Sequence, residues 1–171
     1  MSKLSIGTVQ FGLDYGVANT AGQLSLDSAK AILHTAYNRG IQSIDTAVAY
    51  GSSEQVLGKI GVADFQVVTK LPVIPEGSAI ETWTEKQLAE SLLRLKLSKV
   101  YGVLLHQPLQ LLEQNGSKTY NSMQKAKKEG LVEKIGISVY EPSDLEKLCN
   151  QYDFDLIHVP MNIIDNPWDD W

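Results

Sequence analysis

The fold of this chain is decided by the stretch SIDTAVAYG, which runs from residue 43 to residue 51. Its first residues read as the end of a short β-strand, entered from a helix that stops at Gly40. That strand closes on the carboxylate of Asp45, and the phenol of Tyr50 follows five residues later. A strand that ends on an ionisable group and leads through a loop into a helix predicts a parallel sheet with functional groups at the strand ends.

Two later strand-like runs also end on a reactive side chain. The run QVVT (66–69) leads into Lys70, and the run VLL (103–105) leads into His106. Parallel strands end at the same edge of a sheet, so an acid, a phenol, an amine and an imidazole are expected to meet there. The sequence therefore predicts a catalytic cluster of four side chains: Asp45, Tyr50, Lys70 and His106.

Strands and helices alternate along the whole chain, which predicts one α/β domain over residues 1–171. An open doubly wound sheet and a closed barrel both fit the alternation. The stretch GTVQFG (7–12) lacks the G-x-G-x-x-G spacing and reads as strand and loop with no helix directly after it, which disfavours a nucleotide-binding doubly wound sheet. We expect an incomplete (β/α)₈ TIM-barrel fold with about six of its eight units, because a full barrel needs about 250 residues.

Composition excludes several classes of protein. Apolar residues make up 43% and charged residues 20% of 171 residues, and the net charge is −5, so neither nucleic acid nor an anionic membrane is an expected partner. The single cysteine and the absence of a long apolar run predict a cytoplasmic protein. Three histidines on separate elements predict no metal site, and His34 reads as a packing residue.

The four predicted side chains suit one kind of chemistry. A phenol has an ordinary pKa near 10, and a neighbouring ammonium lowers the pKa by favouring the phenolate. A carboxylate keeps the ammonium charged, and an imidazole can orient a substrate oxygen. This set predicts protonation of a carbonyl oxygen during hydride transfer from a nicotinamide. Singly, each group also fits a cap, a solvated strand end or a packing role, and Lys70 alone would fit a Schiff-base lyase or isomerase.

Five motifs make the resemblance specific, since they follow the order of one family along essentially the whole chain: GTVQFG (7–12), IDTAVAYG (44–51), VTK (68–70), LHQP (105–108) and IGIS (135–138) after Gly130. The chain resembles the aldo-keto reductases. The resemblance implies NADPH, less often NADH, as coenzyme and a small carbonyl compound as substrate. It makes Tyr50 the proton donor, Lys70 and Asp45 its tuners, and His106 the residue that orients the carbonyl.

The same resemblance implies a cofactor-binding set at the nicotinamide end: Gly7, Thr8, Asp45, Ser138 and His158. Two positions depart from the family pattern, because Val139 replaces the usual asparagine and His158 the usual glutamine. The last two strand–helix units, with their phosphate-binding loops, are also missing, so we expect a truncated member with weakened coenzyme affinity. Its open barrel edges predict self-association. The alternative is a catalytically silent barrel that acts as a binding or regulatory module.

Overall fold

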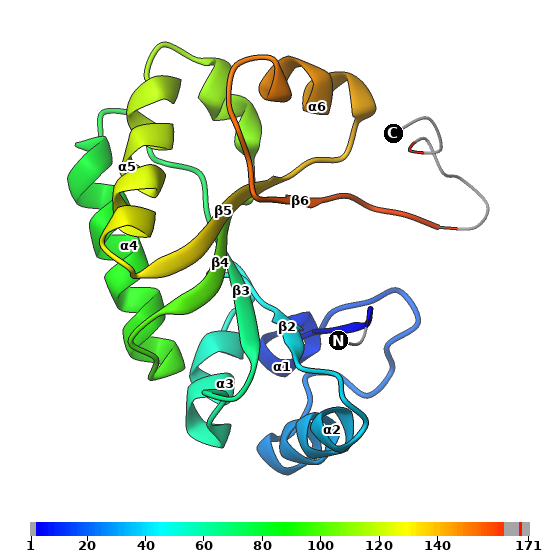
Figure 1. The fold of residues 1–171 in the computed structure, drawn as a ribbon. Helices are drawn as coiled ribbons and strands as arrows, with labels where there is room; N and C mark the ends of the chain where they lie inside the picture. The colour runs from blue at the N-terminus through cyan, green and yellow to red at the C-terminus, as the bar shows by residue number, and fades with distance from the viewer. Residues whose placement is uncertain (1–2, 163–167, 169–171) are drawn as a thin grey trace.

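The computed structural model describes residues 3–162 and residue 168. Strands and helices alternate throughout, as the sequence predicts, and Figure 1 shows the course of the chain. The elements in chain order are β1 (Ser5–Gly7), α1 (Val9–Gly12), α2 (Leu26–Asn38), β2 (Ser43–Asp45), α3 (Ser53–Ile60), β3 (Gln66–Leu71), α4 (Ile80–Leu95), β4 (Val100–Leu105), the 3₁₀ helix η1 (Pro108–Leu112), α5 (Gly116–Lys128), β5 (Val132–Ser138), α6 (Pro142–Cys149) and β6 (Leu156–His158).

The six strands form one parallel sheet in the order β1-β2-β3-β4-β5-β6. Each strand therefore pairs with its neighbour in sequence, and every strand ends at the same edge. Gly7 is in register with Asp45, which is in register with Val68. Among the described residues, β1 pairs only with β2 and β6 only with β5, so both are edge strands. This confirms the predicted incomplete (β/α)₈ barrel with six units.

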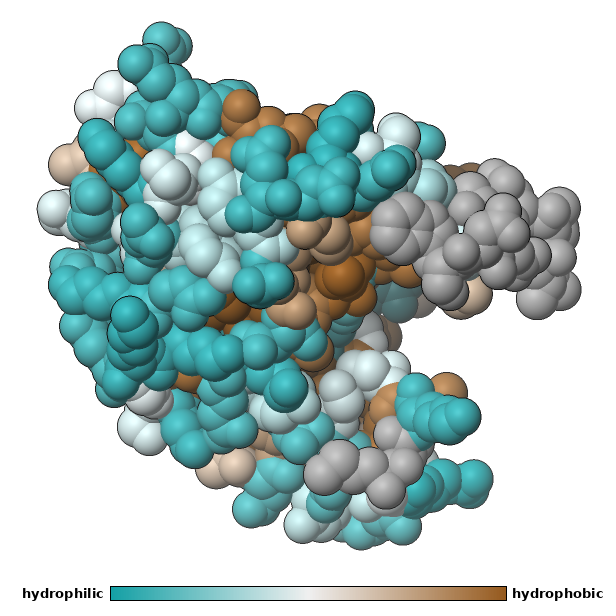
Figure 2. Space-filling model, turned by 45° about the horizontal axis from the view of Figure 1, so that its top comes forward, coloured by the Kyte–Doolittle hydropathy of each residue, from teal (hydrophilic) through white to brown (hydrophobic). Residues whose placement is uncertain are grey.

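The sheet curls, and its helices cover the outer face. In Figure 1, α3, α4 and α5 lie outside the strands, while the gap between β1 and β6 opens on the opposite side. In the space-filling view, apolar residues gather on the wall of this opening and polar residues cover the outside (Figure 2). Gly102 and Gly136 let Leu156 of β6 pack tightly against β4 and β5, because an added Cβ at Gly102 would lie 2.6 Å from the Leu156 side chain. Strand β6 is thus held close to β4 and β5.

The core lies between the sheet and the helices. Ile44, Leu57 and Leu88 are each at most 1% exposed, and each such side chain contributes roughly 1.5–3 kcal/mol on burial. Helix α2 begins where the sequence predicts, because the Ser25 side chain accepts a hydrogen bond from the backbone N–H of Ser28. These contacts fix the strand ends on which the predicted functional side chains lie.

Two expectations were wrong. Residues 9–12 are not a loop but the helical turn α1, which follows β1 at once. The turn forms because Phe11 is buried in the core and Gly12 packs against the loop that carries Tyr50, where an added Cβ would lie 1.8 Å from the Tyr50 carbonyl oxygen. His34 is exposed and hydrogen-bonds Asn38 instead of packing, since its position on α2 points away from the sheet. No helix within the described ranges is both long and apolar enough to cross a membrane.

Candidate active site

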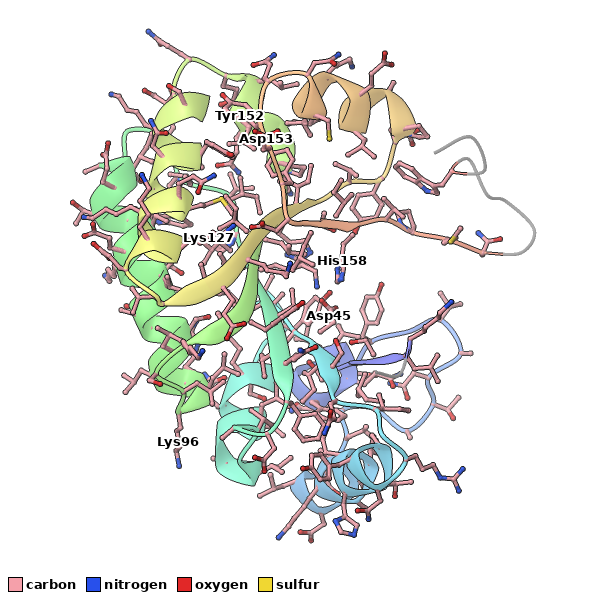
Figure 3. The ribbon with its side chains drawn as sticks, in the orientation of Figure 1. Asp45, Lys96, Lys127, Tyr152, Asp153 and His158 are labelled. Carbon is pink, nitrogen blue, oxygen red and sulfur yellow. The ribbon has the colours of Figure 1, made fainter. Side chains whose placement is uncertain are left out.

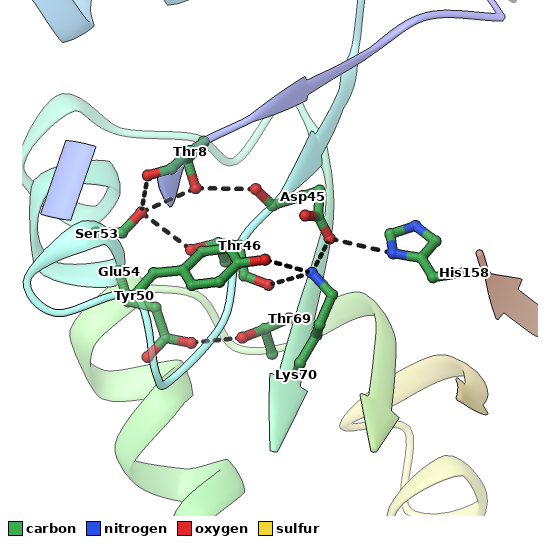
Figure 4. Close-up of polar contacts among 9 residues, drawn as sticks. All are labelled: Thr8, Asp45, Thr46, Tyr50, Ser53, Glu54, Thr69, Lys70 and His158. Carbon is green, nitrogen blue, oxygen red and sulfur yellow. Dashed lines mark hydrogen bonds and ion pairs between the residues drawn. The ribbon is translucent and has the colours of Figure 1, made fainter. Parts of the chain in front are cut away.

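Lys70 is the centre of the polar cluster at the carboxyl edge of the sheet. Its ammonium donates hydrogen bonds to a carboxylate oxygen of Asp45, to the Tyr50 hydroxyl at 3.3 Å and to the Thr46 carbonyl oxygen at 3.3 Å (Figure 4). The lysine is buried in β3, while Asp45 ends the neighbouring strand β2. Adjacent parallel strands therefore bring the amine and the carboxylate together, as the sequence predicts.

Tyr50 reaches the cluster from the loop between β2 and α3. The backbone N–H of Val48 donates to the Lys70 carbonyl oxygen at 3.1 Å, which ties this loop to β3. Gly51 has a φ of +55° and lies against Gly12, so a side chain at either glycine would push the two segments apart. The Lys70 nitrogen also lies 5.0 Å from the centre of the Tyr50 ring. The phenol is thus half-buried with its hydroxyl next to the ammonium.

Two imidazoles flank this group. His106 follows β4, and its ring stands edge-on to Tyr50 with 5.9 Å between the ring centres. His158 ends β6, and its Nδ1 lies 3.5 Å from the Asp45 carboxylate. Figure 3 shows Asp45 and His158 close together, one reaching from β2 and the other from β6. The structure therefore brings together all four predicted catalytic residues and adds His158 to them.

Burial controls the charges in the cluster. It lowers the pKa of Lys70, an effect that the charge of Asp45 and its hydrogen bond oppose. Burial also lowers the pKa of His106, and the Lys70 ammonium lowers it further, which favours a neutral imidazole. The pKa of Tyr50 is raised to about 12, first by burial and then by the Asp45 carboxylate. The sequence-based expectation of a lowered phenol pKa was wrong, because burial disfavours the charged phenolate and the negative charge of Asp45 opposes it further.

A cleft of about 260 Å³ opens beside the cluster and is lined by Asp45, Tyr50, Lys70, Ser138, Tyr140, His158, Val159 and Pro160. Ser138 and His158 of the predicted cofactor-binding set therefore lie at this cleft together with Asp45. Sequence reasoning missed Tyr140, a 64% exposed side chain at the cleft mouth. The signal available was its place just after β5, at the functional edge of the sheet.

The other two predicted cofactor-binding residues lie behind Asp45. Thr8 is fully buried, and its hydroxyl donates to the Asp45 carbonyl oxygen at 2.9 Å and accepts a hydrogen bond from Ser53. Gly7 ends β1 and has open space around it, since an added Cβ would meet no atom within 4 Å. Val139 is 2% exposed and packs in the core, but it also borders a neighbouring cavity that His106, Ser138 and Tyr140 line. The described residues hold no cluster of three or more side chains suited to a metal ion.

Two curated proteins are similar in sequence to most of this chain. The chain is 32% identical over 145 residues to L-galactose dehydrogenase from Arabidopsis thaliana, a match that covers 79% of this chain and 45% of that protein. It is 31% identical to D-threo-aldose 1-dehydrogenase from a Pseudomonas species, over 86% of this chain and 55% of that protein. The chain thus spans about half the length of the curated relatives that it matches.

Solved structures show the same fold. A crystal structure described as a candidate aldo-keto reductase from Pseudomonas aeruginosa superposes with a TM-score of 0.80 at 29% identity, covering 96% of this chain and 65% of that one. The model of the aldo/keto reductase family matches residues 3–169. With the half-barrel, the polar cluster and these matches in agreement, the chain belongs to the aldo/keto reductase family.

Proposed function

We propose that this chain carries the proton-donating site of an NADPH-dependent carbonyl reductase, with NADH as the less common coenzyme. The observation that carries the proposal is the position of the Lys70 ammonium, which bridges the Asp45 carboxylate and the Tyr50 hydroxyl at the edge of an open cleft. The relatives named above act on sugars by their printed names, which supports small hydroxylated carbonyl compounds as the substrate class.

The cleft offers groups that suit the nicotinamide end of the coenzyme. Ser138 presents a hydroxyl and His158 an imidazole on the wall that adjoins Lys70. Gly7 leaves open space at the end of β1, and Thr8 supports Asp45 from behind. The bound coenzyme would supply the hydride. The nicotinamide ring would be held and oriented by Ser138, His158, Gly7 and Thr8.

The chain's own residues would then manage the proton. As negative charge develops on the carbonyl oxygen, the Tyr50 hydroxyl donates its proton to that oxygen. An alkoxide is a stronger base than a phenolate, so this transfer is downhill even for a phenol whose pKa is about 12. The Lys70 ammonium, 3.3 Å away, stabilises the phenolate that remains, and a neutral His106 donates a hydrogen bond that orients the carbonyl.

Two observations favour weak coenzyme binding by this chain. Val139 is buried and apolar at the position where the family resemblance implies a side-chain amide that binds the nicotinamide. In the described lining of the cleft, Lys70 is the one lysine or arginine, and Asp45 already engages it. The apolar Val139 and the lack of a second cationic residue in the described cleft lining support the second candidate function, a catalytically silent barrel that acts as a binding or regulatory module. We also propose that the edge strands β1 and β6 mediate self-association.

The two candidate functions differ in a direct measurement. Titration of the protein into NADPH and NADH, followed by nicotinamide fluorescence, gives a saturable signal for a reductase and none for a silent barrel. Coenzyme oxidation at 340 nm with an aldose or a simple aldehyde then tests turnover. The variant Tyr50→Phe, which removes only the hydroxyl group, should abolish turnover and leave the circular dichroism spectrum unchanged. Undiminished turnover in this variant would remove Tyr50 from the mechanism.

A further inference from the structure

Glu54 is a buried carboxylate that the proton transfer does not use. Glu54 is 1% exposed, and its two carboxylate oxygens accept three hydrogen bonds. One oxygen accepts from the Thr69 hydroxyl at 2.7 Å and from the Ser91 hydroxyl, and the other accepts from Nε of Arg94 at 2.7 Å. Burial of a carboxylate is costly unless it is paired and hydrogen-bonded, so all three contacts are needed to hold it there.

The partners of Glu54 connect it to the strand that carries Lys70. Thr69 precedes Lys70 in β3, and successive side chains of a strand point to opposite faces of the sheet. Lys70 therefore projects toward the cleft while the Thr69 hydroxyl meets Glu54 on the helix side (Figure 4). The Thr69 contact therefore fixes β3 on the face covered by the helices. The next residue, Lys70, places its ammonium on the opposite face, toward the cleft.

Glu54 is equally close in sequence to Tyr50. It lies in the first turn of α3, four residues after the phenol. Next to it, the Ser53 hydroxyl lies 2.8 Å from the Thr8 hydroxyl and 2.9 Å from the Thr8 carbonyl oxygen, and the Ser53 N–H donates to the Tyr50 carbonyl oxygen at 3.0 Å. The turn that begins α3 is thus fixed to Thr8, the residue after β1, through Ser53 and to β3 through Glu54, and the Tyr50 loop ends at this turn.

Tight packing limits how far this network can shift. Gly58 of α3 lies so close to α4 that an added Cβ would sit 2.1 Å from the Arg94 carbonyl oxygen. Arg94 also reaches Glu90 at 3.9 Å, on the same helix. Loss of the Glu54 contacts would therefore not be absorbed by closer approach of the two helices. It would free the first turn of α3 and the loop before it.

We propose that Glu54 is a positioning residue, which fixes the distance between the Tyr50 hydroxyl and the Lys70 amine by joining the first turn of α3 to the back of β3 at Thr69. The catalytic consequence rests on the proposed function, but the positioning itself does not. A carboxylate that served only global stability would have no special effect on the loop 46–53. Loss of a positioning residue should therefore increase the mobility of residues 46–53, whereas loss of a residue that serves global stability should not affect this loop in particular.

Hydrogen–deuterium exchange separates these roles. The variant Glu54→Gln keeps the shape of the side chain but turns an amide toward Arg94, and Thr69→Val removes one hydroxyl at nearly constant volume. We expect the amides of residues 46–53 to exchange at least about tenfold faster in both variants, with β5 unchanged. Asp155→Asn is the matched control, because Asp155 also joins a helix residue, Lys127, to a strand amide, that of Ile135.

The control should leave exchange at residues 46–53 unchanged. Equal acceleration across β3, β4 and β5 in the Glu54 and Thr69 variants, or no acceleration at 46–53, would overturn the proposal. With an active wild type, we also expect kcat to fall roughly 10- to 100-fold in Glu54→Gln while KM for NADPH stays constant. A wild type without turnover would refute the reductase function and leave the exchange experiment to decide on Glu54.

Discussion

Nδ1 of His158 lies 3.5 Å from the same Asp45 oxygen that accepts the hydrogen bond of the Lys70 ammonium. The three groups therefore form one electrostatic unit that spans β2, β3 and β6. Burial lowers the pKa of His158, the Asp45 carboxylate raises it, and the Lys70 ammonium lowers it again. The pKa of His158 therefore depends on the charges of Asp45 and Lys70.

The first prediction concerns this coupling. Lys70→Met removes a positive charge next to His158, so the pKa of His158 should rise, whereas Asp45→Asn should lower it. Histidine NMR titrations measure both shifts, with the resonance assigned by His158→Gln. The exposed His34 serves as the internal control, because its described hydrogen bond is to Asn38 on the same helix. Equal His158 titration curves in all three proteins would show that the contact carries no coupling.

The second prediction is a loss of stability in mild acid. The pKa values of His106 and His158 are both lowered in the folded chain, whereas an unfolded histidine titrates near 6.5. As the pH falls below about 6.5, the unfolded chain binds protons that the folded chain does not, so the free energy of unfolding decreases. Urea unfolding between pH 7 and pH 5 measures this decrease. The double variant His106→Asn, His158→Asn should show a flatter profile, and an equally steep one would contradict the prediction.

A third prediction uses the contact between α1 and the Tyr50 loop. Gly12→Ala places a methyl group 1.8 Å from the Tyr50 carbonyl oxygen, so the loop or α1 must move. We expect a loss of roughly 1–3 kcal/mol in the free energy of unfolding, measured in urea, together with a lower kcat. Gly7→Ala is the matched stability control, because its added methyl meets nothing within 4 Å. A Gly12→Ala protein as stable as the Gly7→Ala protein would refute the tight contact.

Coenzyme affinity provides a fourth prediction. Val139→Asn combined with His158→Gln introduces two side-chain amides next to Ser138. Two added hydrogen bonds of about 1 kcal/mol each should strengthen NADPH binding roughly tenfold or more. Fluorescence titration measures the dissociation constant, and Val139→Leu is the apolar control. If the double variant binds no more tightly than that control, the two positions do not determine nicotinamide recognition.

The fifth prediction addresses self-association. Strand β6 is an edge strand, and its Ile157 is 42% exposed. A charge on an edge strand disfavours pairing with another chain, so Ile157→Lys should shift the protein toward the monomer in sedimentation velocity experiments. Leu93→Lys is the matched control, since Leu93 is 78% exposed but lies on α4. A wild-type protein that sediments as a monomer at every concentration would exclude association through these edges.

Much of the fold could be predicted because local patterns and tertiary packing agree. Ser25 caps α2 and Gly61 ends α3, as their positions indicate. The turn α1 could not be predicted, because its four residues are helical only through the packing of Phe11 and Gly12. The cluster of Lys70 with Asp45, Tyr50 and His106 could be predicted from residues at or just past the strand ends. The raised pKa of Tyr50 did not, since it depends on burial and on which group Asp45 faces.

The amine and the carboxylate of this site belong to strands, whereas the phenol belongs to a connecting loop. The charge pair is therefore part of the sheet, whereas the position of the proposed proton donor depends on how its loop packs against α1 and β3. A grafted loop between β2 and α3 could present a different acid to the same ammonium. Any such graft would have to keep the close fit of Gly51 against Gly12, because that contact fixes the loop against α1.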